Sequence, residues 1–283
     1  MHIINGTVLA TKLRHELRID IAEVGILPYL KVMLVGSDPA SHLYVSLKKK
    51  AAEEVGIRVD VHELSADTPD DTLVQMIEEW NADTGVHGIL VQLPFPRGHI
   101  EQRVIDAIAP EKDVDGFHPQ NVTALTEGVA TVIPPLHEGI LRLIAESSLS
   151  VNGSQAVIIA NSDIFASPLA HLLKTAGAHT HIMKPDDIEL STLKLADIVI
   201  IAIGRTRFLQ ATAVKSSAVV IDVGTNKQAD GRVVGDVDFA SFEVTDAWVT
   251  PVPGGVGPMT IAQLLRNVFR LACVSRDNDQ TSP

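Results

Sequence analysis

The chain has 283 residues, of which 46% are hydrophobic, and its formal net charge is −12. This length exceeds one average domain and allows two, each with its own core. The acidic charge repels nucleic acid and acidic membrane surfaces, so we expect neither as a partner. The stretch nearest to a membrane span, ADIVIIAIG, is far shorter than the roughly 20 residues required. The composition therefore predicts a protein that binds small molecules.

Cysteine content and the N-terminus indicate a cytoplasmic location. Cys273 is the single cysteine, which excludes an internal disulfide framework and a site with several cysteine ligands. The N-terminal segment MHIINGTVLATKL has no basic region followed by an apolar run and no small-residue cleavage signature. We therefore expect the chain to stay in the cytoplasm.

Apolar, strand-like runs alternate with segments of helical period along the whole chain. In the first half, runs at 29–36, 57–64 and 86–94 alternate with helical patterns at 39–56 and 68–83. In the second half, strand-like runs occupy 156–160, 179–183, 197–204, 218–224 and 247–252. Several of these runs are almost continuously apolar, as in parallel strands that are covered on both faces. The pattern predicts an α/β fold of two lobes, the second built on a parallel sheet.

The predicted domain boundary lies between DVDGFHPQN and VIPPLHEG, where glycine and proline interrupt both periodicities. We expect residues 1–135, joined by a C-terminal helix over 258–275, to form one domain. Residues 136–257 should form the other. The polar tail 276–283, RDNDQTSP, has no core pattern and is expected to fray.

Three polar side chains are candidates for chemistry in the first domain. Tyr44 and Lys48 are four residues apart, so they share one face of the predicted helix. Alternatively, Lys48, Lys49 and Lys50 form a solvated cationic turn. Gln92 directly follows an apolar strand, at the carboxyl end where open α/β sheets bind ligands.

Two further segments are ambiguous when taken alone. In KDVDGFHP, Asp113 and Asp115 fall on the same side of an extended segment, where either could instead cap a turn. The segment TPVPGGVGPMT at 250–260 is a glycine-rich loop before a helix, or only a tight connection.

Together these stretches resemble the methylenetetrahydrofolate dehydrogenase/methenyltetrahydrofolate cyclohydrolase family, the FolD proteins, over almost the whole chain. The motifs that carry the resemblance are, in order, YVSLKKKAAEEVGI, GILVQLPFP, PEKDVDGFHPQNV and TPVPGGVGPMT. The resemblance implies a folate-binding lobe, a Rossmann-like NAD(P)-binding lobe, a cleft between them and a homodimer. It also implies oxidation of 5,10-methylenetetrahydrofolate and hydrolysis of the methenyl product to 10-formyltetrahydrofolate.

The resemblance also assigns roles to individual residues. Lys48 would be the catalytic lysine, Tyr44 its partner beside the folate ring, and Gln92 the group that tunes the lysine. Asp115 would be the carboxylate that hydrogen-bonds the pterin, which leaves Asp113 with a structural role. The residues that would line the same cleft from the glycine-rich loop are Pro253, Gly254 and Gly257.

The loop that should hold the cofactor pyrophosphate departs from the family pattern. Ala160, Asn161 and Ser162 stand where the family has glycine, arginine and serine. Phe165 and Ala166 stand where it has valine and glycine, which adds side-chain bulk where backbone should approach the pyrophosphate. Without the arginine, the loop lacks a guanidinium for the 2′-phosphate of NADP.

Other positions on the cofactor side are unusual too. Pro185 replaces a serine that contacts the 2′-phosphate, so the sequence predicts weak binding of NADP. Asp186 or Asp187 could hold a ribose hydroxyl of NAD or could cap a helix, and both interpretations stay open. Thr225 fits a contact on the nicotinamide side. His137 falls in a segment where the family has cysteine, threonine and proline facing the nicotinamide.

We assign no metal site. His179 and His181 alternate on one predicted strand, but the sequence offers no third ligand at a suitable spacing. We therefore interpret both as exposed residues of a sheet.

Three functions are compatible with these patterns. The first is a folate enzyme that keeps cyclohydrolase activity, with its dehydrogenase activity reduced or altered in cofactor use. The second is a fully bifunctional NADP enzyme, and the third is a non-catalytic folate-binding paralogue. The third is disfavoured by the intact set of Lys48, Tyr44, Gln92 and Asp115, because a pure binder has little need for a desolvated lysine. The first two differ only at the cofactor loop.

Overall fold

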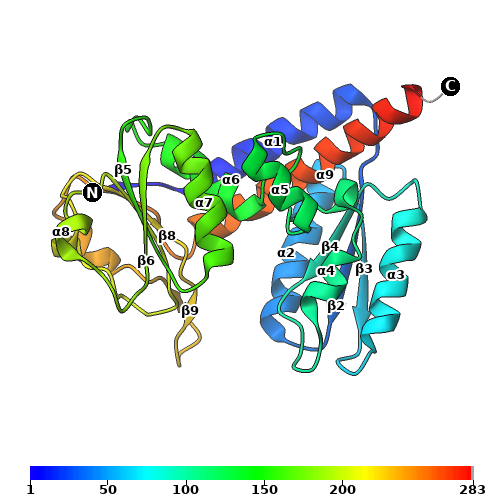
Figure 1. Cartoon of the computed structure of the whole chain (residues 1–283), viewed down its shortest axis with the longest axis horizontal. Coiled ribbons are helices and arrows are strands. Elements are labelled where there is room, and N and C mark those ends of the chain that lie inside the picture. The colour runs from blue at the N-terminus through cyan, green and yellow to red at the C-terminus, as the bar shows by residue number, and fades with distance from the viewer. Residues whose placement is uncertain (282–283) are drawn as a thin grey trace. The chain divides into compact units, whose positions relative to one another are not determined.

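The computed structural model describes residues 1–281 and divides the chain into two compact units (Figure 1). One unit, here called the nucleotide unit, contains Met1–Ala10 and Leu136–Thr260. The other, here called the folate unit, contains Thr11–Pro135 and the chain from Ile261 onward. The α/β fold with a parallel sheet agrees with the sequence-based prediction.

The first ten residues belong to the nucleotide unit, whereas the predicted boundary assigned them to the same domain as residues 11–135. Strand β1, His2–Ile3, pairs in parallel with β11, Trp248–Val249. The backbone amide of Ile4 also donates to the carbonyl of Val249 at 2.9 Å. A two-residue strand is too short to show a periodicity, so this pairing could not be predicted from sequence patterns.

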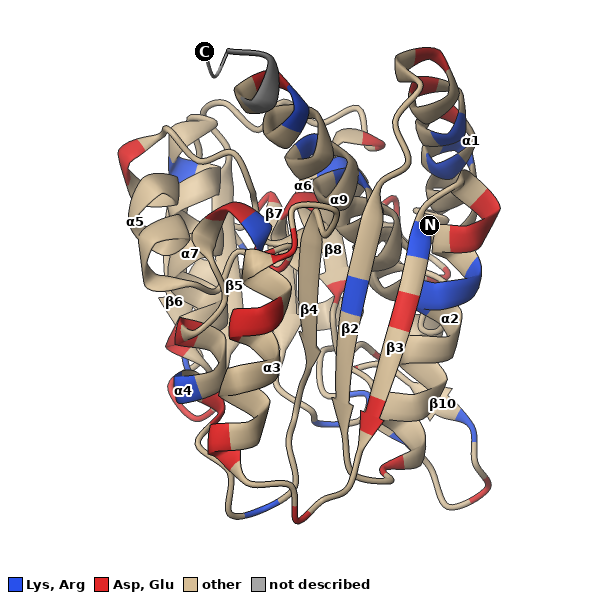
Figure 2. Cartoon of the chain, turned by 90° about the vertical axis from the view of Figure 1, so that its right-hand side faces the viewer, with Lys and Arg blue, Asp and Glu red and all other residues tan. Residues whose placement is uncertain are grey.

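The folate unit is built on three parallel strands in the order β3-β2-β4. Their bounds are Tyr29–Val35 for β2, Arg58–Leu64 for β3 and Gly88–Gln92 for β4. Strand β2 is central and mostly buried, whereas the edge strand β3 is partly exposed and carries charges of both signs (Figure 2). Charged side chains suit an exposed edge because they discourage pairing with other strands. The helices before the domain boundary are α1 Gly6–Val24, α2 Pro39–Val55, α3 Asp70–Ala82, α4 Glu101–Asp106 and α5 Pro119–Glu127.

Helix α2 has clear start and stop signals. The side chain of Asp38 caps its N-terminus by accepting from the Ser41 amide at 2.8 Å, and Pro39 occupies the first turn. Gly56 ends the helix with φ +91°, a left-handed conformation that glycine adopts without strain. These caps fix the register of the helix that carries Tyr44 and Lys48.

The nucleotide unit contains a six-stranded parallel sheet in the order β1-β11-β8-β7-β5-β6. The four strands not yet described are β5 Gln155–Ala160, β6 His179–Met183, β7 Ile198–Ala202 and β8 Val219–Asp222. A two-stranded ribbon, β9 Asn226–Lys227 and β10 Val233–Val234, follows β8. The helices of this region are α6 Pro135–Ala145, α7 Asp163–Thr175 and α8 Leu190–Leu193.

The C-terminal helix α9 spans Val256–Thr281, longer at both ends than the predicted 258–275. Its apolar face, including Leu264 and Val268, joins the core around Leu30 of β2. The helix continues past Arg276, whose guanidinium donates to the Val24 carbonyl at 3.2 Å, and the fraying of this tail stays a prediction. Ser282 and Pro283 lie outside the described residues. No helix among residues 1–281 is long and apolar enough to cross a membrane.

One buried amide of α9 connects this helix to two loops of the folate unit. The Asn267 side chain donates to the carbonyl of Val114 at 3.0 Å and to that of Ile133 at 2.9 Å. Val114 lies between the two aspartates of the DVD segment. Asn267 therefore helps to hold that segment in place.

Replacing Asn267 with leucine should destabilise the protein, because two backbone carbonyls lose their donor in a buried environment. We expect the free energy of unfolding to fall by about 2 to 4 kcal/mol, as measured by urea denaturation. The nearly isosteric Asn267→Asp variant, which also lacks the donor, should be destabilised as well. Wild-type stability of both variants would contradict this role.

Candidate active site

Lys48 and Gln92 meet at the carboxyl end of β4. The lysine Nζ donates to Oε1 of Gln92 at 2.9 Å. The glutamine amide nitrogen in turn donates to the Leu93 carbonyl at 2.7 Å, which directs the oxygen of the side chain toward the lysine. Burial lowers the pKa of the Lys48 amine, and the nearby charge of Asp115 opposes this shift. The environment thus favours a lysine that can lose its proton.

Asp115 is the acidic member of this group, and burial raises the pKa of its carboxyl to about 6 despite the opposing charge of Lys48. Its backbone is fixed by Asp113, which is 1% exposed. The Asp113 carboxylate accepts from the amides of Asp115, Gly116 and His118 at 2.8 to 3.1 Å. Asp113 is therefore a positioning residue, in agreement with the structural role expected from the sequence.

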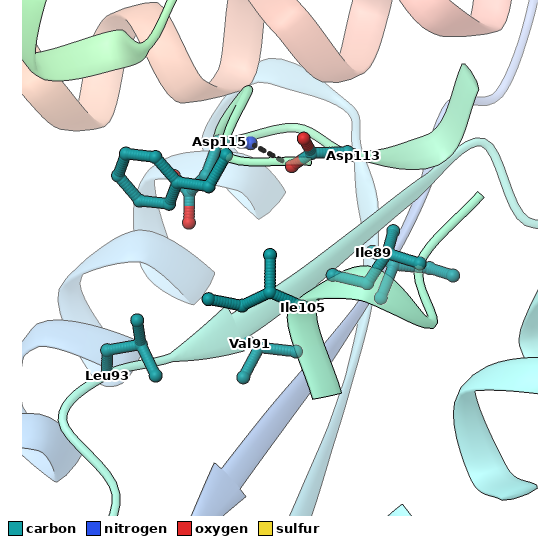
Figure 3. A pocket seen from close by; sticks show the side chains of 8 residues that line it. Ile89, Val91, Leu93, Ile105, Asp113 and Asp115 are labelled. Carbon is teal, nitrogen blue, oxygen red and sulfur yellow. Dashed lines mark hydrogen bonds between the residues drawn. The ribbon is translucent and has the colours of Figure 1, made fainter. Parts of the chain in front are cut away.

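A small, largely apolar pocket lies beside the two aspartates (Figure 3). Asp113 and Asp115 stand at one side of it, while side chains from β4 and from α4 form the apolar wall. The lining residues are Ile89, Val91, Leu93, Ile105, Ile108, Asp113, Asp115 and Phe117. The carboxyl of Asp115 thus lies beside an apolar wall, which contributes to the desolvation that raises its pKa.

The remaining predicted residues of the folate side are placed differently. Tyr44 lies one turn before Lys48 on α2, and 40% of it is exposed. Pro253, Gly254 and Gly257 belong to the nucleotide unit, where the first two precede α9 and Gly257 lies in its first turn. The structure therefore brings together Lys48, Gln92 and Asp115 within one unit.

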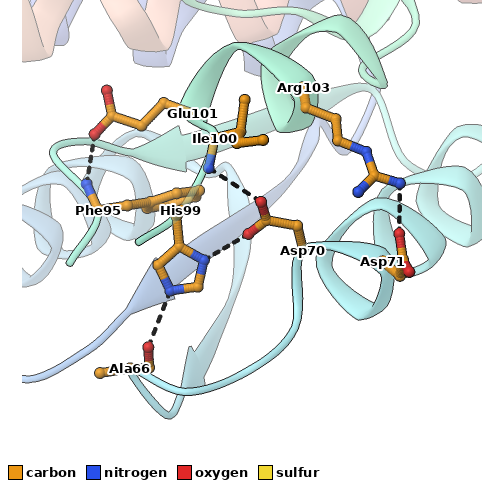
Figure 4. Close-up of polar contacts among 8 residues, drawn as sticks. All are labelled: Ala66, Asp70, Asp71, Phe95, His99, Ile100, Glu101 and Arg103. Carbon is orange, nitrogen blue, oxygen red and sulfur yellow. Dashed lines mark hydrogen bonds and ion pairs between the residues drawn. The ribbon is translucent and has the colours of Figure 1, made fainter. Parts of the chain in front are cut away.

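A polar network that the sequence analysis did not identify fixes the loop after β4 (Figure 4). The His99 ring contacts the Asp70 carboxylate through Nδ1 at 2.6 Å and the Ala66 carbonyl through Nε2 at 3.0 Å. Asp70 also accepts from the Ile100 amide at 3.0 Å, and Glu101 accepts from the Phe95 amide at 2.7 Å. These contacts hold the segment that follows Gln92 against the start of α3.

In the nucleotide unit, the loop after β5 is shaped by contacts that the sequence did not reveal. Ala160 ends β5 and is fully buried, while Asn161 and Ser162 are exposed. The Asn161 side chain donates to the carbonyl of Ile203, after β7, at 2.7 Å. Ser162 precedes α7 without a side-chain cap. The backbone amides of the first turn of α7 thus receive no capping bond from Ser162.

Two departures from the family pattern turn out to contact each other. The Phe165 ring stacks on the ring of His137, with centroids 5.3 Å apart and planes at 28°. His137 is 2% exposed and donates from Nε2 to the Phe165 carbonyl at 2.8 Å. Burial lowers the pKa of His137 and favours its neutral form. The Phe165 ring therefore packs on His137 of α6, and its effect on cofactor binding stays a prediction.

The loops after β6 and β7 carry the other residues expected on the cofactor side. Pro185 is buried and Thr225 is exposed. Asp186 accepts from the Arg205 guanidinium at 2.9 Å, so it does not act as the cap of α8, which begins at Leu190. The sequence analysis missed Lys184, whose Nζ lies 3.3 Å from the carbonyl of Asn161. Its position directly after the second strand of the unit was the available signal.

Two buried aspartates, Asp222 and Asp236, accept hydrogen bonds from backbone amides of the loops after β7 and β8. Asp236 accepts from the amides of Ile203 and Gly204 at 2.7 and 3.0 Å. Asp222 accepts from the amides of Gly224, Asp236 and Val237, and burial raises its pKa to about 6. A Cβ at Gly224 would lie 2.3 Å from the Asp236 carboxyl, so only glycine fits there.

The histidines considered as metal ligands, His179 and His181, are both exposed on β6. Within residues 1–281, no group of three or more His, Cys, Asp or Glu side chains is arranged to hold a metal ion.

Family models match both parts of the chain. The catalytic domain of tetrahydrofolate dehydrogenase/cyclohydrolase matches residues 4–115, and the NAD(P)-binding domain of the same enzymes matches residues 134–276. The chain belongs to this family. The first model covers Lys48, Gln92 and Asp115, and the second covers the loops after β5, β6 and β7.

Individual relatives agree over nearly the full length. The bifunctional protein FolD of Magnetococcus marinus is 46% identical over 94% of this chain and 95% of its own. The crystal structure of the bifunctional FolD enzyme from Campylobacter jejuni is 39% identical, with a TM-score of 0.92 over 97% of this chain and 99% of that one. The Trypanosoma brucei enzyme, solved with NADP and an inhibitor, is 31% identical, with a TM-score of 0.91 over 97% and 98%.

The contact between His99 and Asp70 should make stability depend on pH. The hydrogen bond to Asp70 raises the pKa of His99 above 6.5, and the same bond lowers the pKa of Asp70 below 3.8. The interaction of His99 with Asp70 makes its full contribution to the free energy of unfolding between pH 3.8 and pH 6.5. Its contribution fades as pH rises through the raised pKa of His99, or falls through the lowered pKa of Asp70.

We therefore expect the difference in melting temperature between wild type and His99→Gln to shrink as pH rises from about 6 to 9, as measured by calorimetry. His171→Gln, at a partly exposed position of α7, serves as the control and should show no such trend. A pH-independent difference for His99→Gln would exclude a charged histidine in this contact.

Proposed function

We propose that this chain oxidises 5,10-methylenetetrahydrofolate with NAD(P) and hydrolyses the methenyl product to 10-formyltetrahydrofolate. The observation that carries this proposal is the partly buried Lys48, whose Nζ donates to Gln92 beside Asp115. The folate unit would bind the substrate, and the nucleotide unit would bind the cofactor. A homodimer remains an expectation from the family resemblance, and a cytoplasmic location remains an expectation from the cysteine content and the N-terminal segment.

Lys48 would act in the hydrolytic step. Water adds to the cationic methenyl carbon and must lose a proton, which a neutral amine can accept. Ring opening then breaks the bond from this carbon to one ring nitrogen, and that nitrogen takes up a proton. A lysine with a lowered pKa can take part in both transfers, because less free energy is needed to remove its proton than from an exposed lysine.

Asp115 and Gln92 would orient the reacting groups. An ionised carboxylate can accept two hydrogen bonds from the aminopyrimidine edge of a pterin, and Asp115 is ionised above about pH 6. Gln92 fixes the lysine amine with an acceptor that carries no charge, so it does not raise the pKa of the lysine as a carboxylate would. Tyr44, one turn earlier on α2, would flank the folate ring.

The residues of the nucleotide unit fit an NAD(P) cofactor, which accepts the hydride from the methylene carbon when bound. The first turn of α7 follows Ser162 without a side-chain cap, so its amides can bind the pyrophosphate. Ala160 and Asn161 would border this site, Pro185 would flank it, and Thr225 would contact the nicotinamide side. Asp236 holds the loop at Gly204 for this purpose. A non-catalytic paralogue has no observation in its favour.

The variant Lys48→Met keeps most of the aliphatic length but removes the titrating amine. We expect hydrolysis of methenyltetrahydrofolate to fall by roughly two to four orders of magnitude, measured by loss of its absorbance, while tetrahydrofolate still binds. Lys50→Met, at an exposed position of the same helix, is the matched control and should keep wild-type activity. Unchanged hydrolysis by Lys48→Met would refute the role of this lysine.

The charge of Asp115 should shape the pH profile of hydrolysis. This carboxylate raises the pKa of Lys48, so Asp115→Asn should lower that pKa further. The rising limb of kcat against pH should then move to lower pH, even though weaker pterin binding also increases KM. Asp106→Asn, an exposed position of α4, should leave the limb in place. A shift to higher pH would contradict the proposed coupling.

A further inference from the structure

We propose that His137 is a positioning residue for cofactor binding, which fixes the first turn of α7 from the neighbouring helix α6. The inference rests on the proposed NAD(P)-dependent oxidation, in which amides of this turn bind the cofactor pyrophosphate. Neither His137 nor its contact Phe165 follows the family pattern. The family pattern therefore does not assign this role.

The first turn of α7 has few buried contacts of its own. Ser162, before the helix, and Asp163 are exposed, and Ile164 is 78% exposed. Phe165 is partly buried, and Ala166 is the first fully buried side chain of the helix. The buried contacts that position this turn are therefore those of Phe165 and Ala166.

Pro168 removes one of the hydrogen bonds that would hold the same turn from within the helix. A proline has no N–H, so Pro168 cannot donate to the carbonyl of Ile164, four residues earlier. A hydrogen bond from outside the helix can compensate for this missing bond.

His137 supplies such a hydrogen bond from α6. Its Nε2 donates to the Phe165 carbonyl at 2.8 Å. Its ring also stacks on the Phe165 ring, with the centroids 5.3 Å apart. The imidazole thus holds both the backbone and the side chain of Phe165.

The other ring nitrogen argues that His137 is more than a packing residue. Nδ1 is buried and has no hydrogen-bond partner among residues 1–281, which costs free energy that an apolar side chain would avoid. Burial lowers the pKa of His137, so the ring is neutral and carries its proton on Nε2, the nitrogen that donates. The Nε2 donor is therefore what a histidine adds at this position.

Helix α6 can act as a support because it packs closely on the start of α9. A Cβ added at Gly139 would lie 3.3 Å from the Cβ of Met259 and 3.5 Å from the amide nitrogen of Thr260. Gly139 is two residues after His137, and the lack of a side chain permits this close approach. Contacts within the nucleotide unit thus link the start of α9, α6 and the first turn of α7.

Cofactor binding to the full-length protein tests the proposal. For His137→Leu we expect the Kd of NAD and of NADP, measured by isothermal calorimetry, to rise about tenfold. The factor should be the same for both cofactors because they share the pyrophosphate. His137→Gln, whose amide nitrogen can donate as Nε2 does, should stay within about threefold of the wild type. His171→Leu, partly exposed and further along α7, is the matched control and should leave both Kd values unchanged.

The variant His137→Phe separates the hydrogen bond from the ring packing, because it keeps a ring that can stack but has no donor. We expect it to fold and to bind both cofactors about as weakly as His137→Leu. Wild-type affinity of His137→Phe would overturn the proposal. The same holds if His137→Gln binds as weakly as His137→Phe.

Steady-state kinetics separates positioning from general damage to the fold. In His137→Phe the KM of the cofactor should rise about tenfold and kcat of oxidation should change less than about twofold, because the hydrogen bond acts on cofactor binding. Hydrolysis of methenyltetrahydrofolate, which needs no cofactor, should be unchanged. An equal fall of both activities would overturn the role of His137. If the wild type bound neither NAD nor NADP, the proposed oxidation would fail as well, whereas hydrolysis by Lys48 would be untouched.

Discussion

The burial of one amine, that of Lys48, is the constraint on which the folate unit depends. A lysine can be held near Gln92 with a lowered pKa only if burial outweighs the opposing charge of Asp115 in its surroundings. The capped helix α2, the central strands and the Asp113 turn provide these surroundings together. The network of His99 and Asp70 then holds the chain after Gln92, so that the amide keeps its orientation.

Much of this arrangement could be predicted from the sequence because it follows from short-range patterns. The apolar strand before Gln92, the four-residue spacing of Tyr44 and Lys48, and the DVD segment each predict local geometry. The contacts that fix them come from distant segments and left no such pattern. Asn267 reaches Val114 across 153 positions of sequence, and no periodicity in α9 distinguishes this residue from its neighbours.

The cofactor side shows why residue-by-residue comparison with a family pattern can mislead. Phe165 and His137 each depart from that pattern, yet the two side chains stack on each other and share a hydrogen bond. The loop at Asn161 also receives a positive charge from outside it, because Nζ of Lys184, directly after β6, lies 3.3 Å from the Asn161 carbonyl. Comparison of single positions does not reveal such contacts between segments that are distant in the sequence.

The route of the chain through the two units has a consequence for how such a protein can evolve. The first ten residues complete the sheet of one unit, and the chain from Ile261 onward completes the core of the other. Neither unit is therefore one continuous stretch of sequence. A gene fragment that ended at the boundary near Leu136 would encode a folate unit without α9 and would leave the apolar side chains around Leu30 uncovered. Recombination at that single boundary would therefore separate α9 from the core that it completes.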